Sequence, residues 1–396
     1  MRTTTTRKRP GAGVVALAAA ALTATVLTHP AQAAGDAPAA AAGHQATQRA
    51  MDAAVAAGVP GVTAEARDAD GVWKSASGVG DLKTGAPRGE NDRFRVGSIT
   101  NTFVAVVLLQ MEAEKKLSLD DTVERHLPGL VTGNGNDGSR ITVRQLLNHT
   151  SGLTDYFSDP QYLETYVLGD GFLQHRYDTL PPGTRLRVAF SHAPQFEPGA
   201  RHSFSHTNDI LAALIVEKAG GRSYEEEVRK RIVAPLKLEA TSHPGTDFGL
   251  PRPSGREHAR IFLAQPDRID DVTEVNGSQF WGDSDIISST GDLNRFYAAL
   301  LTGKLLPPRQ LAKMKSTVAN PDAPGSSYGL GIERLTLGCG TTLWYHDGGT
   351  MGSISLVAMT EDGRHRLAFN FNGTWAAETL LPILDAEFCE APARSR

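Results

Sequence analysis

The sequence predicts a mixed α/β (α+β) fold, in which helices flank an antiparallel sheet and a mostly helical subdomain is inserted between its two halves. Strand-like segments occur near the start of the folded part and again near the end of the chain. Between them, residues 105–250 are mostly helical in pattern, with long Gly/Pro connections. No internal repeat is visible. We expect one domain over 45–391, with the α/β part in 45–97 and 283–391 and the helical part in 98–282.

The N-terminal 33 residues predict a signal peptide. A basic start precedes a small-residue apolar run over 11–27, and Ala31-Gln32-Ala33 matches a signal peptidase site. Thr and Gly interrupt the run, which favours a removed signal over a lasting membrane anchor. Residues 34–44, rich in Ala, Pro and Gly, predict a disordered leader. We therefore expect a secreted, extracellular protein cleaved near Ala33.

Cleavage removes four of the 40 basic residues and none of the 44 acidic ones, which leaves a net charge of −8. The four residues are Arg2, Arg7, Lys8 and Arg9. An acidic secreted protein is a poor candidate for nucleic-acid binding. We expect a monomer that acts on a small molecule or peptide.

Cys339 and Cys389 are the two cysteines of the chain. An even number in an exported protein predicts one disulfide between them. Neither C-x-x-C nor clustered His/Cys spacing occurs, so the sequence predicts no structural metal and no cofactor.

The first elements follow from periodicity and turn residues. Residues 45–57 read as a helix of modest amphipathicity. Residues 62–67 and 72–77 alternate around Asp70-Gly71, which is a hairpin signal. A short helix over 119–127 stops at Pro128, and Thr142 is the expected N-cap of another that runs to 147.

The C-terminal elements are predicted as strands followed by a helix. Residues 344–347, 353–359 and 366–370 alternate or run apolar, and Glu361-Asp362-Gly363 separates the last two. A final helix is expected over 376–388. These strands supply the second half of the predicted sheet.

Ser98 is the first candidate functional residue. It immediately precedes a long apolar segment, 104–111, that reads as a buried helix. A serine on the first turn of such a helix lies at the positive end of the helix dipole, which suits a nucleophile facing an anionic tetrahedral intermediate. Serine is also a preferred N-cap residue, and this stretch alone favours that structural interpretation.

Four stretches together resemble the serine β-lactamase and penicillin-recognising family, on its class C β-lactamase and DD-peptidase side. The stretches are Phe94–Thr100, Ile141–Leu153, Pro198–His206 and Tyr345–Gly348. The resemblance spans nearly all of the mature chain and is greatest to the exocellular D-alanyl-D-alanine carboxypeptidase/transpeptidase type, including Tyr328–Gly331 and the two cysteines. It implies the family fold, Ser98 as nucleophile and an acyl-enzyme intermediate.

Two of the three family motifs are altered. The first, Ser-x-x-Lys, has Asn101 in place of the lysine. The second, Tyr-x-Asn, reads Phe204-Ser205-His206. Because neither an amide nor a phenyl ring exchanges a proton near neutral pH, both of the family's usual base candidates are missing. The third motif, Lys/His-x-Gly, is kept as His346-Asp347-Gly348.

The resemblance also predicts an altered substrate site. Asp347 and Gly349 stand where the DD-peptidase has two threonines that hold the substrate's terminal carboxylate. A carboxylate facing another at about 4 Å costs roughly 1–4 kcal/mol, which argues against a free D-Ala-D-Ala terminus as the natural substrate. Asp285 adds to the expected acidity of the cleft. Trp281 and Phe280 are candidates to wall the cleft, with core packing as the favoured role.

The resemblance places the oxyanion hole at the backbone amides of Ser98 and Gly349, which side-chain replacement does not remove. One hypothesis is therefore a serine hydrolase or acyltransferase that cleaves an amide, peptide or ester. In it, His206 is the base of a Ser98–His206 dyad and His346 helps to protonate the leaving group. The alternative is a catalytically lapsed, penicillin-binding-like protein that acts as a ligand-binding or regulatory module.

Overall fold

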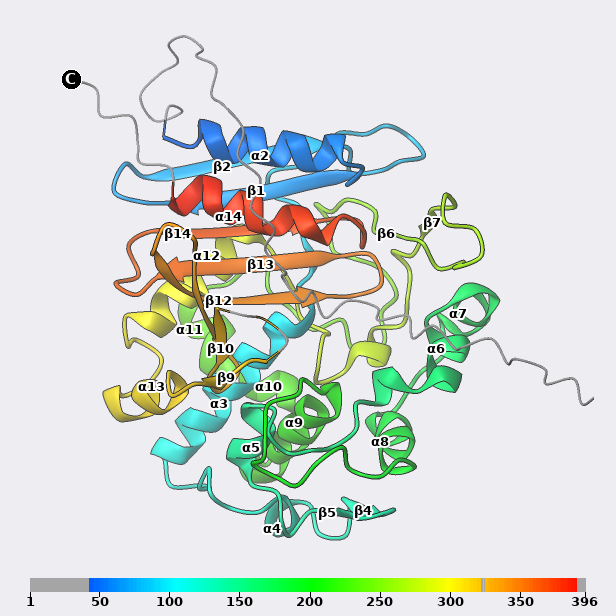
Figure 1. Ribbon diagram of the computed structural model, residues 1–396, viewed down its shortest axis with the longest axis vertical. Helices are drawn as coiled ribbons and strands as arrows, with labels where there is room; N and C mark the ends of the chain where they lie inside the picture. Colours follow the sequence, from blue (N-terminus) through cyan, green and yellow to red (C-terminus); the bar gives the residue numbers. More distant parts are fainter. Residues whose placement is uncertain (1–42, 322, 324, 390–396) are drawn as a thin grey trace, which may run out of the picture.

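The computed structural model describes residues 43–321, 323 and 325–389. The predicted signal peptide, residues 34–42 of the predicted leader and the last two residues of the expected domain lie outside this part of the chain. Figure 1 shows a sheet with helices on both faces in one half of the molecule, and helices in the other half. This confirms the predicted fold class.

The main sheet has eight strands in the order β2-β1-β14-β13-β12-β11-β10-β9, and every pairing is antiparallel. Strand β1 pairs with β14 in a register that sets Val62 opposite Phe371, so the two ends of the folded chain meet in one sheet. The expected hairpin is β1 and β2. The strands are β1 Gly61–Arg67, β2 Val72–Gly78, β9 Val318–Ala319, β10 Ser326–Tyr328, β11 Glu333–Thr336, β12 Thr342–Gly349, β13 Ile354–Thr360 and β14 Arg366–Phe371.

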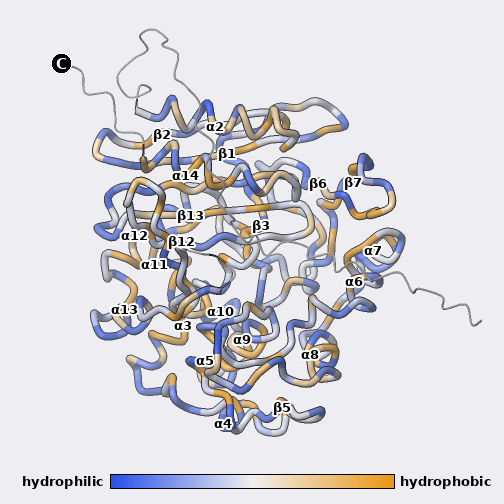
Figure 2. The backbone as a smooth tube through the Cα atoms, viewed as in Figure 1, coloured by the Kyte–Doolittle hydropathy of each residue, from blue (hydrophilic) through white to orange (hydrophobic). Residues whose placement is uncertain are grey.

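Helices cover both faces of this sheet (Figure 1). On one face, α2 (Gln45–Ala56) and α14 (Leu380–Phe388) bury Leu343 and Tyr345 of β12. On the other face, α12 (Thr290–Leu301) and α3 (Thr100–Ala113) pack over Trp344. The central strands are hydrophobic along much of their length (Figure 2). Alternate residues of β12 therefore enter different cores.

The helical half is built around α3, which is buried on all sides because α9 (His206–Gly220) and α13 (Pro308–Met314) pack against it. The predicted helix after Thr142 is present as α5 (Val143–Leu147), and Thr142 forms a capping box with Gln145. The remaining helices are α4 Val123–His126, α6 Pro160–Tyr166, α7 Gly169–His175, α8 Pro182–Phe190, α10 Tyr224–Val228 and α11 Ala234–Leu236. Three two-stranded ribbons complete the fold: β3 Phe94–Arg95 with β8 Ile287–Ser288, β4 Thr132–Gly133 with β5 Asn136–Asp137, and β6 His258–Ala259 with β7 Asp270–Asp271.

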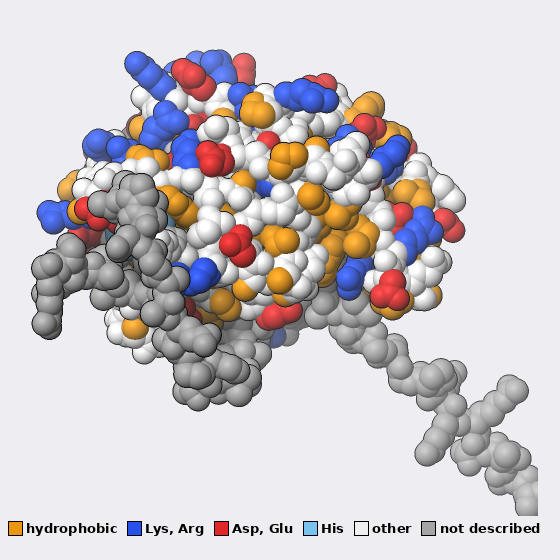
Figure 3. Space-filling model, turned by 90° about the horizontal axis from the view of Figure 1, so that it is seen from above, with side chains coloured by type: hydrophobic (Ala, Val, Ile, Leu, Met, Phe, Trp, Pro, Cys, Tyr) orange, Lys and Arg blue, Asp and Glu red, His pale blue; other side chains and the backbone are white. Residues whose placement is uncertain are grey.

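Within the described residues, no helix combines the length and apolar character needed to cross a bilayer. Cys339 and Cys389 form a disulfide that fastens the β11–β12 turn to the end of α14. On the face above α2, basic and acidic side chains are interspersed rather than gathered by sign (Figure 3).

A buried ionic cluster joins the first helix to the last. Glu387 of α14 accepts hydrogen bonds from Thr47 Oγ1 at 2.6 Å and His365 Nε2 at 2.7 Å, and His44 Nδ1 lies 3.0 Å from it. Burial alone would raise the pKa of Glu387, but the hydrogen bonds from His365, His44 and Thr47 outweigh it and lower the pKa to about 2. The pKa of His44 is raised, because burial is outweighed by Glu387.

Glu387→Gln is expected to lower the free energy of unfolding by about 3 kcal/mol near pH 6. The Glu387 contribution is present above its ordinary pKa of 4.5 and is lost as pH falls toward 2. The His44 contribution is present below its ordinary pKa of 6.5 and is lost as pH rises through its raised value. Urea unfolding from pH 3 to 8 measures the pH dependence of both contributions to the free energy of unfolding. Glu378→Gln, at an exposed position, is the control. An equal loss at every pH would contradict this electrostatic origin.

Candidate active site

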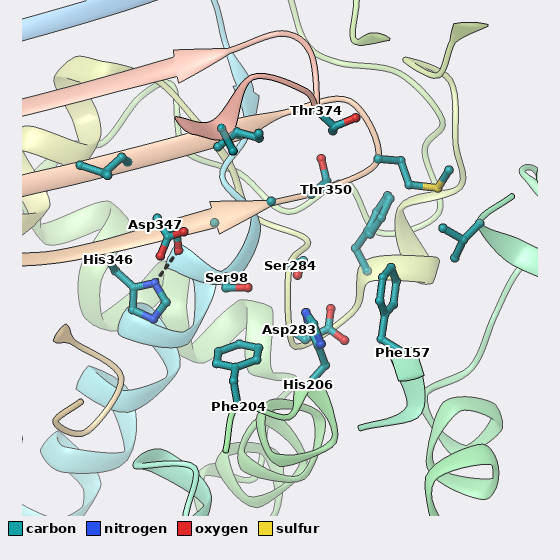
Figure 4. A pocket seen from close by; sticks show the side chains of 18 of the residues that line it. Ser98, Phe157, Phe204, His206, Asp283, Ser284, His346, Asp347, Thr350 and Thr374 are labelled. Atoms are coloured by element: carbon teal, nitrogen blue, oxygen red, sulfur yellow. Dashed lines mark hydrogen bonds between the residues drawn. The ribbon is translucent and has the colours of Figure 1, made fainter. Parts of the chain in front are cut away.

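Ser98 lies in η1 (Gly97–Ile99), a 3₁₀ turn that leads directly into α3. Neither η1 nor α3 has a side-chain N-cap, so the capping interpretation of Ser98 is wrong. Ser98 instead lines a pocket of about 280 Å³ between the sheet edge and the helical half. Figure 4 shows it beside the end of β12, which carries the third motif.

Close backbone packing fixes Ser98 against β12. Gly97 has a φ of +61°, and a Cβ there would lie 2.5 Å from the Gly349 nitrogen. A Cβ on Gly348 would lie 2.5 Å from the Ser98 nitrogen. Both positions therefore require glycine. This packing brings the backbone amides of Ser98 and Gly349 close together, as the oxyanion-hole prediction requires.

His206 is the first residue of α9 and lines the same pocket. Its Nδ1 lies 2.9 Å from Oδ2 of Asp155. The other carboxylate oxygen, Asp155 Oδ1, accepts the backbone N–H of Phe157, which holds the acid in place. Burial lowers the pKa of His206, but the charge and hydrogen bond of Asp155 outweigh it and raise the pKa to about 9.

The second motif faces Ser98 with an aromatic ring. The Phe204 ring stacks on His149 with centroids 4.3 Å apart, and the His206 ring meets it edge-on at 5.0 Å. Figure 4 shows Phe204 and His206 on the helical wall, across the pocket from β12. Within the described residues, no hydrogen bond joins Ser98 to His206. The predicted dyad partners thus share a pocket without direct contact.

Asn101 lies beneath the pocket rather than in it. Both polar atoms of its side chain are buried and have no hydrogen-bond partner at normal geometry among the described residues. Asp209 of α9 is also buried, and burial raises its pKa well above the usual range while His206 and Asn101 lower it. The position of the family's lysine is therefore occupied by an uncharged amide, and burial disfavours the ionised form of the neighbouring Asp209.

His346 points to the α3 side of β12, opposite Asp347. Its Nε2 lies 2.9 Å from the Tyr328 hydroxyl, and its Nδ1 lies 2.5 Å from the carbonyl of Asp347 (Figure 4). Burial lowers the pKa of His346 to about 4. His346 is thus neutral near pH 7 with both ring nitrogens engaged. This arrangement does not support its predicted role in protonating the leaving group.

Asp347 lines the pocket together with Glu333 of β11. Glu333 accepts hydrogen bonds from Tyr345 at 2.9 Å and Ser326 at 3.1 Å. Burial raises the pKa of both acids, and repulsion by Asp347 raises that of Glu333 further. This end of the cleft therefore holds two carboxyl groups whose raised pKa values favour their protonated forms.

Glu333, His346 and Asp347 each offer one potential metal-ligand atom, and these atoms lie within 4.8 Å of one another. However, both nitrogens of His346 already have partners. A metal ion would have to displace one of them. The donor set therefore fits a metal poorly.

Two predicted substrate-binding residues are not in the pocket lining. Asp285 is buried beside Tyr224 and His243, with its Oδ1 accepting the Tyr224 hydroxyl at 2.5 Å. Trp281 donates its Nε1–H to Glu225 at 2.7 Å and packs against the main core. The prediction that these side chains contact substrate is therefore wrong, and for Trp281 the alternative of core packing holds.

The opposite end of the pocket is largely aromatic and apolar. Its lining there comes from Tyr156, Phe157, Tyr162, Tyr166, Val167, Leu168, Ile261, Phe280 and Met351. Asp283 also lines the pocket, but the buried Arg185 holds its carboxylate at 2.9 Å and Tyr156 donates to it at 2.6 Å. One pocket is thus lined by an apolar end, by Ser98 and by the two acids Glu333 and Asp347.

Sequence reasoning missed Asp155 and Glu333. Asp155 lies 51 residues from His206, and only tertiary packing makes them partners. Its sole sequence signal is the Asx-type turn before Phe157. The strand register sets Glu333 opposite Tyr345. Tyr345 lies two residues before Asp347 on the same face of β12, so the register brings Glu333 near Asp347.

A serine at a helix start, beside a strand that ends in His-x-Gly, is the arrangement of serine hydrolases of the β-lactamase and penicillin-binding type. The Beta-lactamase family model matches residues 45–381, and the chain belongs to this family.

A D-stereospecific amidohydrolase from Streptomyces sp. is similar to this chain, with 47% identity, a TM-score of 0.82, and coverage of 87% of this chain and 98% of that one. D-amino acid amidase from Ochrobactrum anthropi SV3 has 26% identity and a TM-score of 0.73, with 87% and 97% covered. Penicillin-binding protein 4* of Bacillus subtilis is 24% identical over 82% of this chain and 71% of its own length.

Proposed function

We propose that this protein is a secreted serine hydrolase or acyltransferase that forms an acyl-enzyme on Ser98 from an amide, peptide or ester. The observation that carries the proposal is the His206–Asp155 pair, at 2.9 Å, on the wall of the pocket that Ser98 lines. With Ser98 these residues make a Ser–His–Asp set, in which the acid orients the base. This set replaces the family's lysine and tyrosine.

In the proposed reaction, neutral His206 accepts the Ser98 proton at Nε2 as Ser98 Oγ attacks the substrate carbonyl. The amides of Ser98 and Gly349 bind the resulting oxyanion. The imidazolium then returns the proton to the leaving amine or alcohol, and the acyl-enzyme forms. Water or a second amine, deprotonated by His206, attacks the ester and releases Ser98.

The similarity to amide-cleaving relatives supports the choice of an acyl substrate. The amidohydrolase from Streptomyces sp. and the D-amino acid amidase each match nearly nine-tenths of this chain. Esterase EstB of Burkholderia gladioli is 30% identical over 46% of this chain and of its own length, which keeps esters within the proposed range. Secretion rests on the signal-peptide pattern over residues 1–33.

The separation of Ser98 from His206 favours a second candidate function, a ligand-binding module that no longer turns over. A positioned base contributes about 10²–10⁴ in rate, and its loss together with the lysine would leave only the pocket. The two candidates differ in whether Ser98 reacts.

Incubation with a fluorophosphonate, followed by mass spectrometry of the digested protein, tests the proposal. We expect one adduct, on Ser98, that is absent in Ser98→Ala and unchanged in Ser284→Ala, since Ser284 also lines the pocket. Absence of labelling in the native protein, with penicillin labelling gained by Asn101→Lys/Phe204→Tyr, would establish the ligand-binding module instead.

A further inference from the structure

His149, in the turn that follows α5, has a left-handed backbone conformation with a φ of +53°. Glycine is the usual residue in such a turn at a helix end, because a Cβ disfavours this conformation. His149 is 1% exposed and is not among the residues that line the pocket. A strained conformation persists only where surrounding contacts hold it, so the contacts of this side chain are informative.

Three contacts join His149 to residues 203–206, the segment that contains the second motif. The His149 carbonyl accepts the N–H of Ser203 at 2.9 Å. Its Nδ1 accepts the backbone N–H of Ser205 at 3.2 Å, and its ring stacks on Phe204 with centroids 4.3 Å apart. His206 is the next residue and begins α9. His149 therefore fixes the backbone from which His206 enters the pocket.

The contact at Nδ1 determines the protonation state of His149. A backbone N–H can only donate, so Nδ1 is an acceptor and the ring proton is on Nε2. The side-chain Nδ2 of Asn208 lies 3.1 Å from the same Nδ1, and Nε2 lies 3.7 Å from Oδ1 of Asp209. Burial lowers the pKa of His149 well below its ordinary value of 6.5, and the charges of His202 and His346 lower it further. His149 thus keeps its acceptor at neutral pH.

We propose that His149 is a positioning residue that sets His206 against Asp155 through the backbone of the second motif. Loss of the Nδ1 acceptor would remove a hydrogen bond from the buried backbone of Ser205. The segment would then shift, and the 2.9 Å contact between His206 and Asp155 would lengthen. The proposal deepens the proposed function, on which it rests only for the rate that His206 contributes.

Two amide variants separate the two ring nitrogens. His149→Asn places an acceptor oxygen where Nδ1 lies, whereas His149→Gln places its amide near the position of Nε2 and Asp209. We expect His149→Gln to lower kcat for an activated ester about 10²-fold, with KM changed by less than about twofold. His149→Asn should keep kcat within about fivefold of the native value.

Two further variants control for backbone strain and for loss of a buried histidine. His149→Gly suits the left-handed backbone and removes the ring, so it should lower kcat as His149→Gln does. His126→Gly removes another buried histidine, which pairs with Asp121 at 3.1 Å and does not line the pocket. It should leave kcat unchanged. Thermal melting checks that every variant is folded.

NMR titration of His206 in the Ser98→Ala background gives a readout that does not depend on turnover. Contact with Asp155 raises the pKa of His206 to about 9. His149→Gln and His149→Gly should move this pKa toward its ordinary value, whereas His149→Asn and His126→Gly should not. A merely structural role of His149 would lower the melting temperature without moving the pKa of His206.

An unchanged pKa of His206 in folded His149→Gln and His149→Gly would overturn the proposal. Equal loss of kcat in His149→Asn and His149→Gln would also overturn it, because the acceptor at Nδ1 would then not be the group that matters. If the pKa moves as expected but the native protein neither hydrolyses the ester nor reacts with a fluorophosphonate, the positioning role stands and the hydrolase is refuted. Labelling of Ser98 that no His149 variant affects, with an unchanged pKa of His206, would do the reverse.

Discussion

His206→Ala should lower kcat/KM for an activated ester by about 10²–10⁴-fold, because it removes the group proposed to take the Ser98 proton. The effect follows from the position of His206 at the start of α9 and its 2.9 Å contact with Asp155. Stopped-flow or plate assays of ester hydrolysis measure it. His192→Ala is the matched control, since His192 pairs with Asp159 at the same 2.9 Å outside the pocket lining.

The pH profile separates a catalytic His206 from a structural one. A base must be neutral, and Asp155 raises the pKa of His206 to about 9, so kcat/KM should rise with pH until about 9. Asp155→Asn removes the charge that favours the imidazolium. The rise of kcat/KM with pH should therefore move to lower pH, while the maximal rate falls. If kcat/KM rose over the same pH range in Asp155→Asn as in the native protein, the proposed pair would be contradicted.

Arg185→Met should lower the free energy of unfolding by about 3–5 kcal/mol, because it leaves the carboxylate of Asp283 buried without its countercharge. Arg185 is fully buried and donates to Asp283 at 2.9 Å and to the carbonyls of Gln279 and Trp281 at 3.2 and 2.8 Å. It therefore ties α8 to the segment that leads into β8. Equilibrium unfolding in urea measures the loss.

Arg187→Met, two residues along α8 and exposed, should change stability by less than about 0.5 kcal/mol. The double variant Arg185→Met/Asp283→Leu should recover part of the loss, because it removes both buried charges. If the double variant were as unstable as the sum of the singles, packing rather than the ion pair would be the cause.

Local patterns predicted most of the fold because each pattern carries its own physical cause. The Asp70-Gly71 turn gave the β1–β2 hairpin, and Thr142 with Gln145 capped α5 as expected. The apolar run 104–111 predicted a buried helix, and α3 is buried on every side. The pairing of β1 with β14 agrees with the expectation of one sheet in two halves, although the sequence did not predict the order of the strands.

Residues of the site could be predicted only where the order of the motifs and the packing of the backbone determine their positions. Ser98 and His206 line one pocket, whereas Asp285 and Trp281, near in sequence to Asp283, turn away from it. A segment of irregular backbone has no fixed periodicity, so its sequence does not say which side chains face a cavity. The partner of each polar group there depends on what packs against it.

The sequence alone determined the fold class, the place of Ser98 in the first motif and the absence of the family's lysine and tyrosine, because these depend on residue type and chain order. Tertiary structure alone decided that Ser98 is not a helix cap, that Asp155 charges His206, and that Glu333 joins Asp347. Those properties depend on distances between segments far apart in the chain. Electrostatic interaction in a low-dielectric pocket varies steeply with such distances.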